Sequence, residues 1–317
     1  MKLLLSLPAN ITALSFIVCL LATGSLAVDL ANAQDAERKL ILDADTANEI
    51  DDMFAIVRML NQDQYEVLAL SSAQWIHYLG PSDSVDLSQQ INEELLELLY
   101  KTSLPAPKGS TEPMGKPWGG FDPKDSAAAQ TIIHAARNAS PENKLIVLCL
   151  GASTNLASAI ALEPGIAKNI EARILAFHFD WTTKAWNKSE FNVRRDLNAG
   201  DYLLNCKELE LHIMPTSVSR QLTFSRDETF EKLRRLGELG EYLTGKWKAR
   251  FASRETWIMW DITLIEALLH PQLATTELVT TPPENVQRQV WMYRTIDVKA
   301  MQADYWSVLL ASEQATQ

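Results

Sequence analysis

Residues 39–60 have the sequence KLILDADTANEIDDMFAIVRML, in which an acidic turn separates two apolar patterns. The run from Lys39 to Asp43 has the length and composition of a buried strand. From Asp51 onward, apolar residues fall at 53, 54, 56, 57 and 60, which is the spacing of an amphipathic helix. A strand that leads directly into a helix is the repeating unit of a parallel sheet, so this segment predicts an α/β protein.

The same alternation of strand and helix patterns continues along the chain, up to a last helix that ends before Pro271. We therefore predict an open, mostly parallel, Rossmann-like sheet with helices on both faces, in which ligands bind beyond the carboxyl ends of the strands. We expect the tail over residues 277–308 to be rich in strands. The predicted strands are 39–43, 65–71, 145–150, 172–177 and 209–214, and the predicted helices are 51–60, 87–100, 126–137, 154–162, 198–206, 229–250 (with a break near Gly240) and 262–269.

The N-terminus has the pattern of an export signal. Lys2 supplies a positive start, residues 13–28 are apolar, and Ala31-Asn32-Ala33 has the A-x-A form of a cleavage site. An uncleaved membrane anchor is the alternative, but the apolar run is shorter than the roughly 20 residues that a spanning helix needs. We predict a signal peptide over 1–33, a single domain over 34–317, and an exported product, periplasmic or secreted, without membrane attachment after cleavage.

The composition restricts the partners. The 317 residues include 29 Lys and Arg against 40 Asp and Glu, which gives a formal net charge of −11. This charge argues against nucleic acid and anionic membrane as partners. We expect a small-molecule partner instead, and a homo-oligomer stays open. After the signal, Cys149 and Cys206 are the two cysteines of the sequence, too few for a disulfide framework and without metal-binding spacing.

The acidic turn places five carboxylates within residues 43–52, in the sequence DADTANEIDD. Like charges at this density repel one another unless a cation lies between them, and hard cations such as Ca²⁺ and Mg²⁺ prefer oxygen ligands. The alternative is that Asp51 and Asp52 only stabilise the start of a helix. The further pair Asp43 and Asp45, at the end of the strand, favours a metal site.

This segment resembles the N-terminal fingerprint of the inosine-uridine-preferring nucleoside hydrolases, a strand followed by D-x-D-P-G-x-D-D and an apolar helix. Residues 46–50 stand here for P-G-x, which makes the loop two residues longer. Three downstream segments match the family in order. They are LGASTNLA at 150–157, similar to x-G-P-L-T-N-I-A; EFNVRRDLNA at 190–199, similar to E-F-N-x-x-x-D-P-x-A; and WD at 260–261, where the family has His-Asp.

The resemblance implies calcium-dependent hydrolysis of the N-glycosidic bond of a ribonucleoside or related N-riboside, with release of base and ribose. Asp45 is then both a Ca²⁺ ligand and the general base on the metal-bound water. The other implied ligands are Asp52, Asp261 and the backbone carbonyl of Leu150. The implied substrate contacts are Asp51, Glu190, Asn192 and Trp260, while Asp43 and Asn155 support the site from behind. Such a reaction passes through a cationic, oxocarbenium-like sugar, which surrounding carboxylates stabilise.

Two departures from the family pattern concern the leaving group. Trp260 stands in place of the histidine that helps to protonate a purine, and a tryptophan can stack on a flat base but cannot act as a general acid. The glycine-asparagine pair that follows the second strand is replaced by AQWIH at 73–77. We take Gln74 or His77 as candidates for the missing polar contacts, with a surface loop histidine as the simpler interpretation of His77. His178 follows the strand pattern at 174–177 and is a separate candidate for the pocket.

Two other functions stay open on the residues alone. The sequence LILDADT at 40–46 also resembles the opening motif of haloacid dehalogenase-type phosphatases, in which the first Asp attacks phosphorus. That family needs a lysine and a late acidic pair, for which the chain offers no convincing counterpart. An exported protein that binds a nucleoside or sugar without cleaving it is the second alternative, and the retained set of metal carboxylates argues against it.

Overall fold

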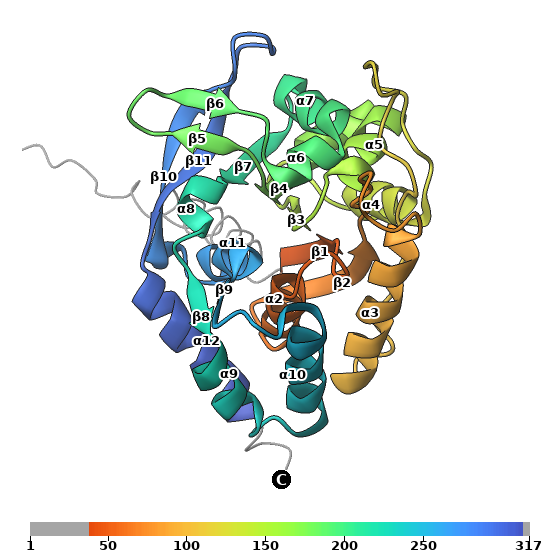
Figure 1. Cartoon of the computed structure of the whole chain (residues 1–317). Helices are drawn as coiled ribbons and strands as arrows, with labels where there is room; N and C mark the ends of the chain where they lie inside the picture. Colours follow the sequence, from red (N-terminus) through yellow and green to blue (C-terminus); the bar gives the residue numbers. More distant parts are fainter. Residues whose placement is uncertain (1–37, 313–317) are drawn as a thin grey trace, which may run out of the picture. The chain divides into compact units, whose positions relative to one another are not determined.

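A seven-stranded sheet forms the centre of the protein. The computed structural model describes residues 38–312, and within them the strand order is β10-β11-β7-β4-β3-β1-β2 (Figure 1). Every neighbouring pair is parallel except β10 with β11, so the predicted open, mostly parallel α/β sheet is confirmed. The strands are β1 (Arg38–Ala44), β2 (Tyr65–Ser72), β3 (Leu145–Cys149), β4 (Ile170–Leu175), β7 (Glu210–Met214), β10 (Ala274–Thr280) and β11 (Gln289–Ile296).

Helices cover both faces of this sheet. Successive strand residues point to opposite faces, and in β1 the side chains of Leu40 and Leu42 join one core cluster while Ile41 joins another. The first cluster packs on α2 (Asp51–Leu60), α3 (Ser84–Leu98), α10 (Gly237–Phe251), α11 (Trp260–Leu269) and α12 (Val298–Ser312). The second packs on α4 (Ala127–Arg137), α5 (Thr154–Leu162) and α7 (Leu197–Asn205), on the other side of the sheet in Figure 1.

The remaining elements are short. They include the helices α6 (Phe191–Arg195), α8 (Thr216–Ser219) and α9 (Arg226–Leu233) and the 3₁₀ turns η1 (Pro164–Asn169) and η2 (Pro271–Leu273). Two antiparallel strand pairs lie outside the main sheet: β5 (His178–Asp180) with β6 (Ala185–Asn187), and β8 (Thr223–Ser225) with β9 (Thr256–Ile258).

Two sequence predictions about the second half of the chain were wrong in part. The break expected near Gly240 in the helical stretch 229–250 exists, but it lies at residues 234–236, because α9 ends at Leu233 and α10 begins at Gly237. Gly240 lies inside α10, and a Cβ there would stand 1.8 Å from the Leu233 carbonyl oxygen, so this glycine permits a close contact and does not break the helix. The tail is β-structured only as far as Ile296, after which α12 packs apolar residues of helical spacing on the core.

The functional edge of the sheet is the one where β1, β3, β4 and β7 end. Backbone hydrogen bonds continue the strand pairing one residue beyond β3 and β4. The Leu150 N–H donates to the backbone carbonyl of Asp43 at 2.8 Å, and the Ala176 N–H donates to the backbone carbonyl of Met214 at 3.2 Å. The acidic turn therefore follows β1 at the edge where a parallel sheet binds its ligands.

The predicted signal peptide over 1–33 lies outside the described residues. Among the helices within 38–312, none combines the length and the apolar character needed to cross a bilayer.

Candidate active site

Three carboxylates from two helices meet at this edge. Asp51 and Asp52 stand in the first turn of α2, and Asp261 stands in the first turn of α11. One oxygen from each lies within 4.8 Å of the other two, and each residue is only 2% exposed. The backbone N–H of Asp261 donates to the second oxygen of Asp51 at 3.4 Å. The structure thus brings residues more than 200 positions apart in the sequence into one acidic group.

Asp45 approaches the same group from the end of β1. An ideal Cβ on Gly151 would lie 2.8 Å from the Asp45 carboxyl group, so only a glycine lets the loop after β3 pass this closely. Asp45 lines the same cavity as Asp51, Asp52 and Asp261. The predicted ligand Leu150 comes directly before this glycine and is buried beside it.

The acidic group contains buried oxygens that nothing in the described chain satisfies. Asp45 Oδ2, Asp51 Oδ1, Asp52 Oδ1 and Asp261 Oδ1 are buried and have no hydrogen-bond partner within residues 38–312. Leaving a buried charged oxygen unpaired is costly, so such groups normally pair with a cation. A set made only of carboxylate and carbonyl oxygens is the donor chemistry that Ca²⁺ and Mg²⁺ prefer. The residues therefore fit a divalent metal ion.

The pKa values of these groups follow from the same crowding. Burial raises the pKa of Asp45, Asp52 and Asp261 well above the ordinary value, and the neighbouring carboxylates raise it further. Burial also raises the pKa of Asp51, to about 6, although hydrogen bonds from its surroundings lower it. A bound cation would act in the opposite direction and favour the charged carboxylates.

Asp43 and Asn155, which were predicted to support the site, hydrogen-bond to each other at the end of β1. Asp43 Oδ1 accepts from Ser71 Oγ at 2.7 Å and from Asn155 Nδ2 at 2.9 Å. Asn155 also accepts from the Ser110 backbone N–H at 2.9 Å, which ties the long loop before α4 to the site. Burial raises the pKa of Asp43 to about 6 in spite of both hydrogen bonds. The network fixes the end of β1 from which Asp45 projects.

Glu190 and Asn192 come from the start of α6. Glu190 caps this helix by accepting from the Val193 backbone N–H at 3.1 Å. Asn192 Nδ2 donates to the Leu150 carbonyl at 2.7 Å and to the Leu175 carbonyl at 3.0 Å. The amide nitrogen of Asn192 thus holds the loop that carries a predicted ligand, a contact that the sequence motif did not reveal.

A cavity of about 200 Å³ opens over the acidic group. Its lining contains all eight predicted ligands and substrate contacts, and Asp43 and Asn155 lie outside it. The eight residues are Asp45, Asp51, Asp52, Leu150, Glu190, Asn192, Trp260 and Asp261.

The cavity also has lining residues that the sequence did not single out. Glu49, in the lengthened loop, lines it, and burial raises the pKa of this residue to about 7. Thr216 enters from the start of α8, at a position that no motif marks. The acidic composition of the loop was the only available signal for Glu49, and nothing local distinguishes Thr216.

The two candidate histidines have different positions. His178 lines the cavity, its Nδ1 hydrogen-bonds to the Thr216 hydroxyl, and burial and the charge of Arg220 lower its pKa. His77 is not among the lining residues of this cavity. Its ring packs 6.0 Å from that of Phe191, and its Nδ1 accepts from the Leu79 backbone N–H at 3.1 Å. The simpler interpretation of His77, a loop histidine, agrees with this position.

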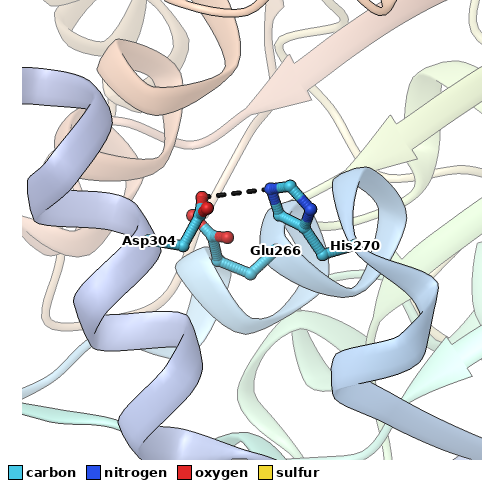
Figure 2. Close-up of side chains that lie close together, drawn as sticks. All are labelled: Glu266, His270 and Asp304. Atoms are coloured by element: carbon cyan, nitrogen blue, oxygen red, sulfur yellow. Dashed lines mark ion pairs between the residues drawn. The ribbon is translucent and has the colours of Figure 1, made fainter. Parts of the chain in front are cut away.

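A second group of possible metal ligands within the described residues lies where α11 and α12 meet. Figure 2 shows Glu266 from α11 and His270, the residue directly after α11, facing Asp304 from α12. Arg58 already places a cation there, since its Nε donates to Glu266 at 2.8 Å and its Nη2 donates to Asp304 at 2.6 Å. A metal ion would be repelled by this guanidinium, so we assign the second group to structure.

The sequence matches the model of the family described as inosine-uridine preferring nucleoside hydrolase over residues 40–304. The chain belongs to this family. Membership in this family makes the protein a hydrolase that acts on N-glycosyl compounds. This class takes precedence over the two alternatives considered from the sequence, a phosphatase and a non-catalytic binding protein.

Individual relatives agree with this family. The probable uridine nucleosidase 2 of Arabidopsis thaliana is 24% identical over 65% of this chain and 67% of its own length. Among solved structures, a plant nucleoside hydrolase superposes with a TM-score of 0.68 at 18% identity, over 87% of this chain and all of its own. The purine-preferring ribonucleoside hydrolase of Gardnerella vaginalis gives a TM-score of 0.66 at 17% identity, over 88% of this chain and all of its own. At these identities the solved structures support the fold.

Proposed function

We propose that the protein is an exported, calcium-dependent ribonucleoside hydrolase that releases ribose and a free base. The observation that carries the proposal is a set of four buried carboxylate oxygens that have no hydrogen-bond partner within residues 38–312, all belonging to residues that line one cavity. The names of the relatives support a ribonucleoside as substrate, but they differ in the preferred base. Export rests on the A-x-A pattern that ends at Ala33.

Asp45, Asp52, Asp261 and the Leu150 carbonyl would hold the cation, and Asp51 completes the acidic group. When bound, the calcium ion supplies a positive charge that orients the ribose hydroxyls and makes water more acidic. Every other step is carried by the chain itself. Asp51, Glu190 and Asn192 lie around the cavity where they can accept hydrogen bonds from sugar hydroxyls.

Asp45 is the proposed general base. It takes a proton from the water whose oxygen bonds to C1′ of the sugar, while the bond between C1′ and the base nitrogen breaks and its electron pair leaves with the base. The sugar becomes cationic in the transition state, and the carboxylates around the cavity stabilise that charge. Typical general base catalysis contributes about 10²–10⁴-fold.

The test is ribose release from a panel of nucleosides, measured as reducing sugar. The mature chain from Gln34, treated with chelator, is assayed without metal, with Ca²⁺ and with Mg²⁺. We expect activity only with a divalent cation, highest with Ca²⁺, and a loss of calcium binding by calorimetry in Asp52→Ala. Full activity in chelator, or equal calcium affinity in wild type and Asp52→Ala, would contradict the proposal. Tight nucleoside binding without any ribose release would restore the non-catalytic alternative.

A further inference from the structure

The two helices that carry the acidic group also meet further along their length. Arg58 follows Asp52 by six residues in α2. Glu266 follows Asp261 by five residues in α11. At about 1.5 Å of rise per residue, the contact between Arg58 and Glu266 lies about 9 Å along α2 and about 7.5 Å along α11 from the acidic group. The two helices therefore run side by side in the same direction, and a contact at one point affects their spacing at the other.

This second contact is a buried ion pair. Arg58 Nε donates to Glu266 Oε1 at 2.8 Å, and the two side chains are 2% and 0% exposed. The same guanidinium donates from Nη2 to Asp304 of α12 at 2.6 Å, which fixes the orientation of the Nε donor. The carboxyl groups of Glu266 and Asp304 lie close together in Figure 2. One arginine thus joins α2, α11 and α12 inside the protein.

Stability is a poor explanation for this pair. Taking two charges out of water costs about as much as their attraction returns, and apolar residues of similar volume are often neutral or stabilising in their place. In some proteins a buried polar contact instead restricts the packing to one arrangement. Every residue of α2, and every residue of α11 after Trp260, is buried. Apolar contacts are non-directional, whereas a hydrogen bond weakens outside its preferred geometry, so the pair restricts how α2 lies on α11.

The placement of α2 on α11 matters most at the acidic group. Asp51, Asp52 and Asp261 repel one another when they are charged, which favours separation of the two first turns. The hydrogen bond between these turns, from the Asp261 backbone N–H to Asp51, is long at 3.4 Å. We propose that the Arg58–Glu266 pair is a positioning device for the metal site, which holds the first turns close enough for one cation to bind both. This inference rests on the proposed function, because it takes these carboxylates as the ligands of the cation.

Calcium titration of a variant without the pair tests this role. Arg58→Met/Glu266→Leu removes both charges together and leaves neither one buried alone, while Asp304 keeps His270 at 3.1 Å. In chelator this variant should unfold at a urea concentration no lower than that of wild type. Its calcium Kd, measured by calorimetry, should rise about 10-fold or more, since changes behind metal ligands typically cost about 10–100-fold in affinity. A merely structural role would lower the urea midpoint and leave the Kd unchanged.

Two control variants assign the effect to the hydrogen bond between the helices. Glu266→Gln keeps an oxygen that accepts from Arg58, so its calcium Kd should equal that of wild type. Arg137→Met/Glu163→Leu removes an exposed ion pair outside α2 and α11, and should also bind calcium like wild type. An unchanged Kd in folded Arg58→Met/Glu266→Leu, or an equal rise in Glu266→Gln, would overturn the inference.

A shorter carboxylate provides the same test if Arg58→Met/Glu266→Leu does not fold. Glu266→Asp keeps the charge but is one methylene shorter, so it reaches Arg58 only if α11 shifts toward α2. We expect its calcium Kd to rise above that of wild type. Calcium affinity equal to that of wild type in Glu266→Asp would refute the positioning role.

Measurements on the wild type separate this inference from the proposed function. If the wild type binds no divalent cation, the proposed function fails and the positioning role fails with it. If the wild type binds calcium and releases ribose, but Arg58→Met/Glu266→Leu binds calcium equally well, only the positioning role fails. If the wild type binds calcium without releasing ribose, the catalytic part of the proposed function fails, while weaker calcium binding in Arg58→Met/Glu266→Leu still supports the positioning role.

Discussion

Glu266→Gln should change how the stability of the protein depends on pH. Glu266 is fully buried in α11, where Arg58 donates to one of its oxygens at 2.8 Å. Its other oxygen has no partner among the described residues. Burial raises the pKa of Glu266 to about 8, Arg58 lowers it, and the nearby Asp304 raises it again. The folded protein therefore favours the protonated form of Glu266, which the glutamine side chain imitates.

The magnitude follows from the two pKa values. A rise from 4.5 to about 8 corresponds to at most about 5 kcal/mol, at about 1.4 kcal/mol per pH unit. Because the pKa is higher in the folded state, the associated stability is fully present below pH 4.5 and is lost as the pH rises through about 8. At pH 6 Glu266→Gln should already be more stable than wild type by about 2 kcal/mol, since that pH lies about 1.5 units above the unfolded pKa. At pH 9 it should be more stable by up to about 5 kcal/mol, or about 10 °C in Tm for a chain of this size.

The assay is urea and thermal unfolding of both proteins at pH 6 and pH 9, at one fixed calcium concentration. Only the difference between variant and wild type is interpreted, because every other group titrates in both proteins. Glu142→Gln at an exposed position controls for the loss of one negative charge. A difference between Glu266→Gln and wild type that is the same at both pH values would refute the reasoning.

Three further predictions concern the metal, the leaving group and the N-terminus. Calcium at 1,000 times its Kd should raise the free energy of unfolding by about 4 kcal/mol, and thermal unfolding should show no such gain in Asp52→Ala. Since Trp260 cannot donate a proton as an acid, p-nitrophenyl riboside should be cleaved about 10²-fold or more faster than inosine in steady-state assays. Similar rates would indicate another acid, and His178→Ala should then slow inosine alone. Mass spectrometry of the exported protein should find an N-terminus near Gln34, and a cytoplasmic product that still begins with Met1 would count against export.

Much of the site was predictable because its residues follow strands or begin helices. Parallel strands end at the same edge, so Asp45 after β1 and Leu150 after β3 had to lie near each other once the fold class was known. The helix pattern after Asp51 placed two carboxylates at a helix start at that edge. Asp261 could be assigned to the site only through the family resemblance, since nothing in the local sequence indicates that α11 begins beside α2.

The contacts that sequence reasoning missed are those between distant segments. Thr216 lines the cavity because β7 lies beside β4 in the sheet, which no short motif encodes. The bond from Asn192 to the Leu150 carbonyl joins α6 to the loop after β3 and depends on the same arrangement. The apolar residues of α12 have helical spacing in the sequence. We nevertheless predicted strands there, because the segments just before α12 have strand patterns.

The balance of forces at the acidic group explains why a cation suits it. The first turns of α2 and α11 place Asp51, Asp52 and Asp261 at helix N-termini, where the helix dipole stabilises each carboxylate by roughly 0.3–1 kcal/mol. Yet the pKa of Asp51 still rises from 3.8 to about 6, which corresponds to about 3 kcal/mol. Burial and repulsion therefore exceed what the helices contribute, and without a cation the site favours protonated carboxylates. In the proposed function, a divalent cation would take the place of these protons and favour the charged carboxylates. The carboxylate charge that the cation leaves unbalanced would then stabilise a sugar that becomes cationic during bond cleavage.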